Sequence, residues 1–286
     1  MCRINSNSSL LGFKGTEDLG GGTKATVQYG LDPRKLARDQ AVGFTSDETF
    51  VGLAGNMGNL RLGSPNSIGL TTFGASTPFG TGIGGGYAHN HVGHTSNIRY
   101  AKSARYDSPS FSGLTVSLLK AEGSNTTVAA TSVATASDII TTGGDRTEIG
   151  LAYTNGPLNI AYANVKLAKY STEKERSANT LAANYNLGAT TLYAGMTSGD
   201  LLSDTTAGTT QKGANIAVKH TMGKIDLLAG YSKRKDTGAD AQKVTGLRAD
   251  YNFSKTTATY VGYEAFKGAT TAADQKLVSI GLRKSF

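Results

Sequence analysis

Apolar and polar residues alternate one by one in segments of about ten residues along most of the chain. A period of two is typical of an extended strand whose two faces differ. In the last segment, residues 277–286, the apolar residues that share one face are Val278, Ile280, Leu282 and Phe286. Serine, glycine and arginine occupy the other face. Strands of this kind and length are typical of a transmembrane β-barrel, in which one face meets lipid and the other meets water.

The composition argues against a conventional apolar core and against a helical membrane protein. Only 38% of the residues are hydrophobic and tryptophan is absent, and no apolar run reaches the roughly 18 residues of a membrane-spanning helix. The 37 glycines disfavour helices, because each interior glycine costs about 1 kcal/mol relative to alanine. The 13 tyrosines and 9 phenylalanines argue against disorder. A barrel with a water-filled interior reconciles these features, because half of each strand is polar.

Short and long connections alternate between the predicted strands. The short turns are residues 155–157, 187–190, 222–224 and 253–256, and the long connections are residues 123–145, 199–211, 235–242 and 267–275. This alternation is typical of outer-membrane barrels, which have short periplasmic turns and long outer loops. A soluble β-sandwich or propeller also has alternating strands, but these usually run ~5–6 residues, which is shorter than several strands here. The sequence therefore predicts an all-β, antiparallel transmembrane barrel.

About fifteen strands are recognisable, and we expect a single barrel domain over residues 1–286. The N-terminal half contributes hairpins at residues 8–31 and 48–64, and further strands at residues 99–121. Single-chain bacterial barrels normally have an even number of strands, so we expect sixteen, with the remaining strand either upstream or formed by residues 1–6. This first stretch lacks the apolar region of a signal peptide, so either a signal peptide has been removed or the chain as given begins late.

Four segments resemble the trimeric general porins of Gram-negative bacteria, in the branch typical of β-proteobacteria. They are the glycine-rich hairpin at residues 12–25, the strand pair at residues 50–63, the Arg-Tyr-Ala-Lys segment at residues 99–114 and the C-terminal segment at residues 281–286. Their order and spacing agree with the family over essentially the whole chain. The resemblance implies a passive outer-membrane channel for small hydrophilic solutes and ions, with no enzymatic activity and no cofactor.

The resemblance also implies an architecture and partners. It implies a sixteen-stranded barrel whose first strand is absent here, a homotrimer in the outer membrane of a Gram-negative bacterium, and contacts with lipid and lipopolysaccharide. The third outer loop, residues 65–98, is expected to fold into the lumen as the constriction. Residues 32–39 are expected either to reach the neighbouring subunit or to form only a solvated charged loop. Phe286 is expected to be the signal that the barrel-assembly machinery reads.

Basic residues without acidic neighbours in the sequence mark the expected constriction. No aspartate or glutamate occurs from Thr49 to Tyr106. The basic residues of this interval are Arg61, Arg99, Lys102 and Arg105. In a narrow aqueous passage, unopposed cations raise the local concentration of anions. We therefore predict an anion-preferring pore that is lined by these four residues.

A structural role is the alternative for these arginines. They can pair with Asp107, Glu48 or acidic residues of the loops, and in that case they brace the barrel and contribute little to selectivity. The arginines that usually line the constriction in this family cannot be assigned to positions of this chain. Two of the corresponding positions hold Leu10 and Ser64 in this chain.

Three of the four histidines lie close together at His89, His91 and His94. Histidine titrates near neutral pH and so changes the local field, which makes this cluster a candidate pH-sensitive loop. Histidine clusters also bind metals. A solvated loop requires neither role, and we assign no metal site.

The sequence offers no site for catalysis or for nucleic-acid binding. The net charge is +8, but lysine and arginine are spread along strands and loops rather than gathered in a block. His220 is the only histidine outside the cluster, so a Ser/His/acid triad has no organised member. The remaining alternative is a non-conducting outer-membrane barrel that acts as an adhesin or as a structural surface protein.

Overall fold

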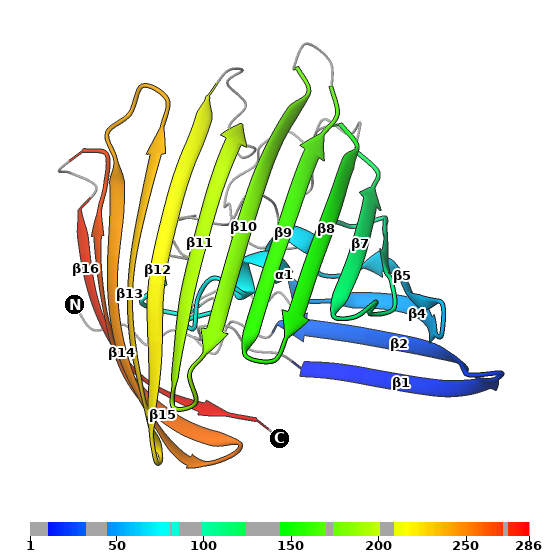
Figure 1. Cartoon of the computed structure of the whole chain (residues 1–286), viewed down its shortest axis with the longest axis horizontal. Helices are drawn as coiled ribbons and strands as arrows, with labels where there is room; N and C mark the ends of the chain where they lie inside the picture. The colour runs from blue at the N-terminus through cyan, green and yellow to red at the C-terminus, as the bar shows by residue number, and fades with distance from the viewer. Residues whose placement is uncertain are drawn as a thin grey trace.

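The structure is a computed structural model that describes residues 11–32, 45–80, 82–85, 99–123, 144–169, 174–200, 209–270 and 274–285. One antiparallel sheet dominates it. Figure 1 shows the strands as a curved wall, with the helix α1 on one side of it. Among the described residues, the first and last strands pair with no further strand, so they form the two edges of the sheet.

The strands follow one another along the chain and are joined as an antiparallel meander. In the first half they are β1 (Leu11–Gly20), β2 (Thr23–Asp32), β3 (Thr45–Ser46), β4 (Thr49–Gly55), β5 (Gly58–Ser64), β6 (Ser103–Asp107) and β7 (Leu114–Ala121). In the second half they are β8 (Arg146–Asn155), β9 (Leu158–Leu167), β10 (Arg176–Asn186), β11 (Thr190–Asp200), β12 (Thr210–Met222), β13 (Ile225–Asp236), β14 (Gln242–Ser254), β15 (Thr257–Lys267) and β16 (Gln275–Lys284). Fifteen of them pair in chain order, and β3 pairs only with β2. The predicted all-β antiparallel architecture is confirmed.

The two faces of the sheet carry different side chains, as the period of two predicts. Large apolar side chains on the outward face remain uncovered by the protein, such as Ile216 (65% exposed) and Val261 (49% exposed). On the inward face the neighbouring positions hold polar residues such as Asn184, Asn215 and Asp250, which are half-buried or buried. An uncovered apolar face opposite a polar face is the arrangement of a barrel wall between lipid and water.

Two clusters of buried apolar residues lie where the inward face of β7 to β10 meets the chain that follows β5. One cluster there consists of Ile68, Tyr100, Leu119, Ala121 and Ala163, and a second consists of Ala75, Ala161 and Ala182. Alanine predominates on the strand side, and its short side chain lets the packed chain approach the wall closely. The core of this protein is therefore a thin layer inside the wall.

The short helix α1 (Ile68–Gly74) is a feature that the sequence analysis did not predict. It lies in the expected constriction loop, residues 65–98, which shows no strand or helix pattern in the sequence. The helix begins after Ser67, whose hydroxyl accepts a hydrogen bond from the Leu70 N–H at 3.0 Å, as an N-cap residue does. No helix in the described part of the chain has the length and apolar character needed to span a membrane.

Substitution of Ile216 by lysine should destabilise the protein in lipid vesicles by about 2–4 kcal/mol, because it places a charge in the middle of the outward apolar band. Urea unfolding of the vesicle-inserted protein measures this change. Tyr193→Lys on the adjacent strand is the control, because Tyr193 pairs with Ala217 on the inward face and its replacement meets water. Equal losses in both variants would contradict the assignment of the two faces.

Candidate functional site

The described residues between Asn66 and Gly85, here called the inner segment, lie against the inward face of the sheet. Hydrogen bonds along the middle of the segment come from asparagines of the wall. Asn184 on β10 donates to the carbonyl oxygen of Ala75 at 3.0 Å, and Asn215 on β12 donates to that of Ser76 at 2.6 Å. The chain therefore crosses the inside of several strands, as expected for a loop that folds into the lumen.

Two buried carboxylates hold the two ends of the inner segment. Oε2 of Glu148 on β8 accepts hydrogen bonds from the N–H groups of Ile68 at 2.6 Å and Gly69 at 3.1 Å. At the other end, the Gly84 N–H donates to Oε2 of Glu264 on β15 at 2.7 Å. Charged acceptors make the stronger hydrogen bonds of this kind. The two glutamates thus fasten the segment to strands that lie far apart in the sheet (Figure 1).

Glycines on the wall let the inner segment lie directly on the strands. Five glycines face it at positions where a β-carbon would overlap the segment: Gly150, Gly195, Gly230, Gly246 and Gly262. The residues that these β-carbons would meet are, in the same order, Ile68, Ser76, Phe79, Gly84 and Ile83. At Gly246 the overlap would be with backbone atoms, which cannot move aside as a flexible side chain can. The wall therefore has glycines, which lack a β-carbon, at positions where this segment lies closest to the strands.

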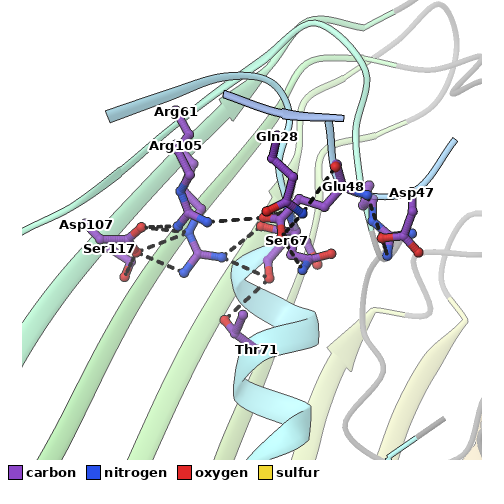
Figure 2. Close-up of polar contacts among 11 residues, drawn as sticks. Gln28, Asp47, Glu48, Arg61, Ser67, Thr71, Arg105, Asp107 and Ser117 are labelled. Atoms are coloured by element: carbon purple, nitrogen blue, oxygen red, sulfur yellow. Dashed lines mark hydrogen bonds and ion pairs between the residues drawn. The ribbon is translucent and has the colours of Figure 1, made fainter. Parts of the chain in front are cut away.

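Two of the predicted pore residues, Arg61 and Arg105, meet carboxylates where the inner segment begins (Figure 2). Arg61 on β5 forms ion pairs with Glu48, at 3.2 Å, and with Asp107. Arg105 on β6 pairs with the same Asp107 at 2.9 Å and donates to the carbonyl oxygen of Asn66 at 2.8 Å. The side chains of Arg61 and Arg105 are 15% and 8% exposed, so both guanidinium groups are mostly withdrawn from water.

Glu48 ties the same arginine cluster to the first residue of the inner segment. Its carboxylate accepts hydrogen bonds from the Asn66 N–H at 3.0 Å and from the Asn66 side-chain amide at 3.1 Å. Nearby, Arg99 pairs with Asp47 at 2.5 Å. These contacts are those of the structural alternative, in which the arginines brace the loop against the wall.

The remaining predicted site residues lie elsewhere. Lys102 is exposed and forms no ion pair with any residue in the described ranges; its backbone carbonyl accepts a hydrogen bond from the Glu122 N–H at 3.3 Å. The candidate pH-sensitive residues His89, His91 and His94 lie outside the described residues, as does the assembly signal Phe286. The roles suggested for these four residues stay predictions.

Further charged pairs lie on β13, β14 and β16, and the sequence analysis did not identify them as sites. Arg248 and Asp250 pair at 2.8 Å, and Arg283 approaches the same aspartate at 3.4 Å. Arg234 and Asp236 pair at 2.8 Å. An arginine and an aspartate two residues apart in a strand share one face, and Arg105 with Asp107 has the same spacing. This Arg-x-Asp spacing was the signal in the sequence that could have located these pairs.

The face that the inner segment turns toward the lumen carries no formal charge. Its described residues include no lysine, arginine, aspartate or glutamate. Thr71, Gly74 and Gly80 are exposed, and Leu70 and Pro78 are half-buried. The described part of the inner segment therefore adds no formal charge to this face.

The described residues contain no group of three or more histidine, cysteine, aspartate or glutamate side chains that could hold a metal ion. His220 contacts the hydroxyl of Thr190 at 2.8 Å, and this pair lies near a short turn rather than at the inner segment. Charged groups of the wall instead bond to the inner segment and fix it in place.

The chain matches the family model described as Gram-negative porin over residues 3–271. It is 28% identical to outer membrane porin protein 32 of Delftia acidovorans over 318 residues, which covers 98% of this chain and 85% of that protein. It is 28% identical to an outer membrane porin protein of Bordetella pertussis over 199 residues, which covers 64% of this chain and 48% of that protein. The alignment thus spans about half of the Bordetella relative.

Solved structures of similar shape extend the comparison to the fold. The anion-selective porin from Comamonas acidovorans matches with a TM-score of 0.78 and 23% identity, covering 99% of this chain and 91% of that chain. OmpF of Salmonella typhi matches with a TM-score of 0.77 and 14% identity, covering 98% and 90%. At this level of identity the likeness concerns the fold, and in both cases it extends over nearly the whole chain.

Replacement of Asp107 by alanine should lower the free energy of unfolding by about 1–3 kcal/mol, because Arg61 and Arg105 both lose an acceptor while they remain largely buried. Urea unfolding in lipid vesicles measures the loss. Asp145→Ala is the matched control. Asp145 pairs with Lys120 at 2.8 Å, and the Lys120 hydrogen bond holds the pKa of Asp145 below its usual value, but the pair is exposed and should matter little. An Asp107→Ala protein as stable as the control would exclude the bracing role.

Proposed function

Because the chain belongs to the Gram-negative porin family, we propose that it is a passive diffusion channel of the outer membrane for small hydrophilic solutes and ions. Solutes cross it down their concentration gradients, and the protein supplies neither a cofactor nor a covalent step. Its contribution is a water-filled passage whose walls set the size and charge of what passes.

The observation that carries this proposal is the inner segment. It is fixed on the polar face of a sheet whose opposite face is apolar and uncovered. A plug that filled the lumen would need side chains that pack against the surrounding wall. The exposed residues of this segment, such as Thr71 and Gly74, instead present a small, wettable surface. A segment of this kind narrows a lumen and leaves a passage beside it.

We also propose that the passage prefers anions weakly. Basic residues at inward positions of the described strands are Lys14, Lys24, Arg61, Arg105, Arg146, Arg176, Lys219, Arg234, Arg248 and Arg283. Acidic residues at inward positions are Asp18, Asp32, Asp107, Glu148, Asp226, Asp236, Asp250 and Glu264. The basic side chains outnumber the acidic ones, and a positive excess along a narrow passage favours anions. The Comamonas structure of similar fold is itself named an anion-selective porin.

The predicted pore arginines are assigned mainly a structural part in this proposal. Arg61, Arg99 and Arg105 are balanced in number by Asp47, Glu48 and Asp107, with which they pair. A paired cation adds little to the field a few ångströms away. The preference then depends on the excess of basic groups along the whole wall, together with the exposed Lys102.

A homotrimer is part of the same proposal. The outward positions of β1 to β5 carry apolar side chains, including Phe13, Val51 and Leu62, and no lysine or arginine. Their one charged residue is Glu17, which lies near the short turn between β1 and β2. One of the solved structures of similar fold is the trimer form of OmpT from Vibrio cholerae, with a TM-score of 0.72. An apolar patch with its single charge at the rim suits contact with a second copy of the chain.

Protein inserted into a planar bilayer should give discrete conductance steps, with a reversal potential in a KCl gradient that shows a preference for chloride. The same sample should run as a trimer on an unboiled gel. Closed, step-free bilayers would contradict the channel and favour a non-conducting adhesin or structural barrel. A reversal potential of the opposite sign would contradict only the anion preference.

Substitutions at Thr71 test whether the inner segment borders the passage. A unit charge ~8 Å from the ion path in water is worth about 0.5 kcal/mol. Thr71→Lys should therefore raise, and Thr71→Asp lower, the chloride-to-potassium permeability ratio by roughly fivefold, since the two ions respond oppositely. Met57→Lys and Met57→Asp, in the exposed turn between β4 and β5, are the matched controls. Ratios that do not move with the charge at Thr71 would place the passage elsewhere.

A further inference from the structure

Arg146, at the first position of β8, is a buried arginine of the inward face that has no carboxylate partner. It is only 8% exposed. No ion pair or hydrogen bond joins its guanidinium group to a described residue, and its Nε is buried without an acceptor. Arg105 and Arg234 are as deeply buried, but each pairs with the aspartate two residues along its strand. A withdrawn cation without a counter-ion is unfavourable, and an anion from solution would relieve this cost.

The carboxylates nearest to Arg146 in the sequence are engaged with other groups. Asp145 pairs with Lys120 at 2.8 Å. Glu148, on the same face of β8, accepts hydrogen bonds from the N–H groups at the beginning of the inner segment. The guanidinium of Arg146 instead lies over the ring of Tyr100, with its Cζ atom 5.1 Å from the ring centroid. The ring covers one face of the guanidinium and leaves its N–H edges for a planar acceptor.

The outer edge of this guanidinium is still open to water. Of its three nitrogens, Nε is the one that is fully buried without a partner, so Nη1 and Nη2 keep contact with solvent. In the strand register, Arg146 lies between Ala121 on β7 and Leu167 on β9, and both of these are buried apolar residues. The two free nitrogens therefore border the lumen on an otherwise apolar part of the inward face.

The height of Arg146 in the wall places it before the inner segment on the way in. β8 begins at Arg146, directly after one of the long connections, which in outer-membrane barrels face the outside. Glu148, which holds Ile68 of the inner segment, lies two residues farther along the strand, or about 7 Å. A solute that enters from outside passes Arg146 first.

We propose that Arg146 binds the carboxylate group of small organic monoanions before they pass the inner segment. A planar guanidinium offers a carboxylate two parallel N–H donors. One unpaired cation beside apolar residues suits a singly charged ligand, because a second charge would lose water without gaining a partner. Arg176 flanks Leu167 on its other side, but it is engaged in another interaction. The inference rests on the proposed anion preference of the passage and adds a site and a ligand class to it.

Saturation-transfer NMR of the folded protein in micelles, titrated with acetate at neutral pH, tests this site. The acetate signal should reach saturation, and acetamide, which has the same shape without the charge, should give none. Arg146→Gln should weaken acetate binding roughly tenfold, because it removes the charged donor. Arg146→Lys should weaken it less, since it keeps the charge and loses only the paired donors. Lys120→Gln, which removes one charge from the opposite face of the neighbouring strand β7, should leave it unchanged.

The proposal would be overturned by equal signals from acetate and acetamide, by unchanged affinity in Arg146→Gln, or by an equal loss in Lys120→Gln. The first of these results needs only the wild-type protein, so it decides the matter even where a variant does not fold. A folded band on an unboiled gel verifies each variant. Conductance steps in planar bilayers test the channel separately. A protein that conducts without binding acetate contradicts only the site, and one that binds acetate without conducting contradicts only the channel.

Discussion

The need to pair every backbone polar group inside hydrocarbon is the constraint on which the rest of this structure depends. A strand in lipid has no water to bond its N–H and C=O groups, so each must find its partner in a neighbouring strand. Fifteen strands that pair in chain order meet this need through nearest neighbours, except along the outer edges of β1 and β16 in the described part of the sheet. The same pairing turns alternate side chains to opposite faces, so the wall has an apolar outward face and a polar inward face.

The polar inward face makes it possible for a chain with little regular structure to cross the interior. Apart from α1, the inner segment has few backbone hydrogen bonds of its own, and the wall supplies others. Glu148 and Glu264 accept from its N–H groups, while Asn184 and Asn215 donate to its carbonyl groups. These polar side chains would be unfavourable in a dry core, and here the segment provides a hydrogen-bond partner for one polar atom of each.

Much of the architecture followed from pattern alone. The alternation of apolar and polar residues and the alternation of short and long connections together predicted the antiparallel wall and its outward apolar face. Both patterns are local, since they depend only on neighbouring residues. The helix α1 was missed because its seven residues are too few to show a helical period, and because packing against wall alanines, rather than propensity, stabilises it.

The ion pairs of the arginine cluster could be predicted only in part from the sequence. Arg61 and Arg105 lie in an interval without acidic residues, so they are unopposed when charges are counted along the chain. Their partners Glu48 and Asp107 lie just beyond the two ends of that interval. Asp107 is a neighbour of Arg105 within β6, but Glu48 and Asp107 both reach Arg61 because strand pairing brings β4, β5 and β6 together. For Arg61, register between strands, rather than distance in sequence, decides which charges meet.

The sequence by itself determined that this chain forms a β-barrel wall with lipid on one side and water on the other. The reason is that the alternation of apolar and polar residues depends only on the order of neighbouring residues. The tertiary structure alone decided which charges of different strands are paired and which glycines admit the inner segment. Each of these depends on contacts between residues far apart in the chain. Such contacts are set by the register and curvature of the whole sheet, which no single segment encodes.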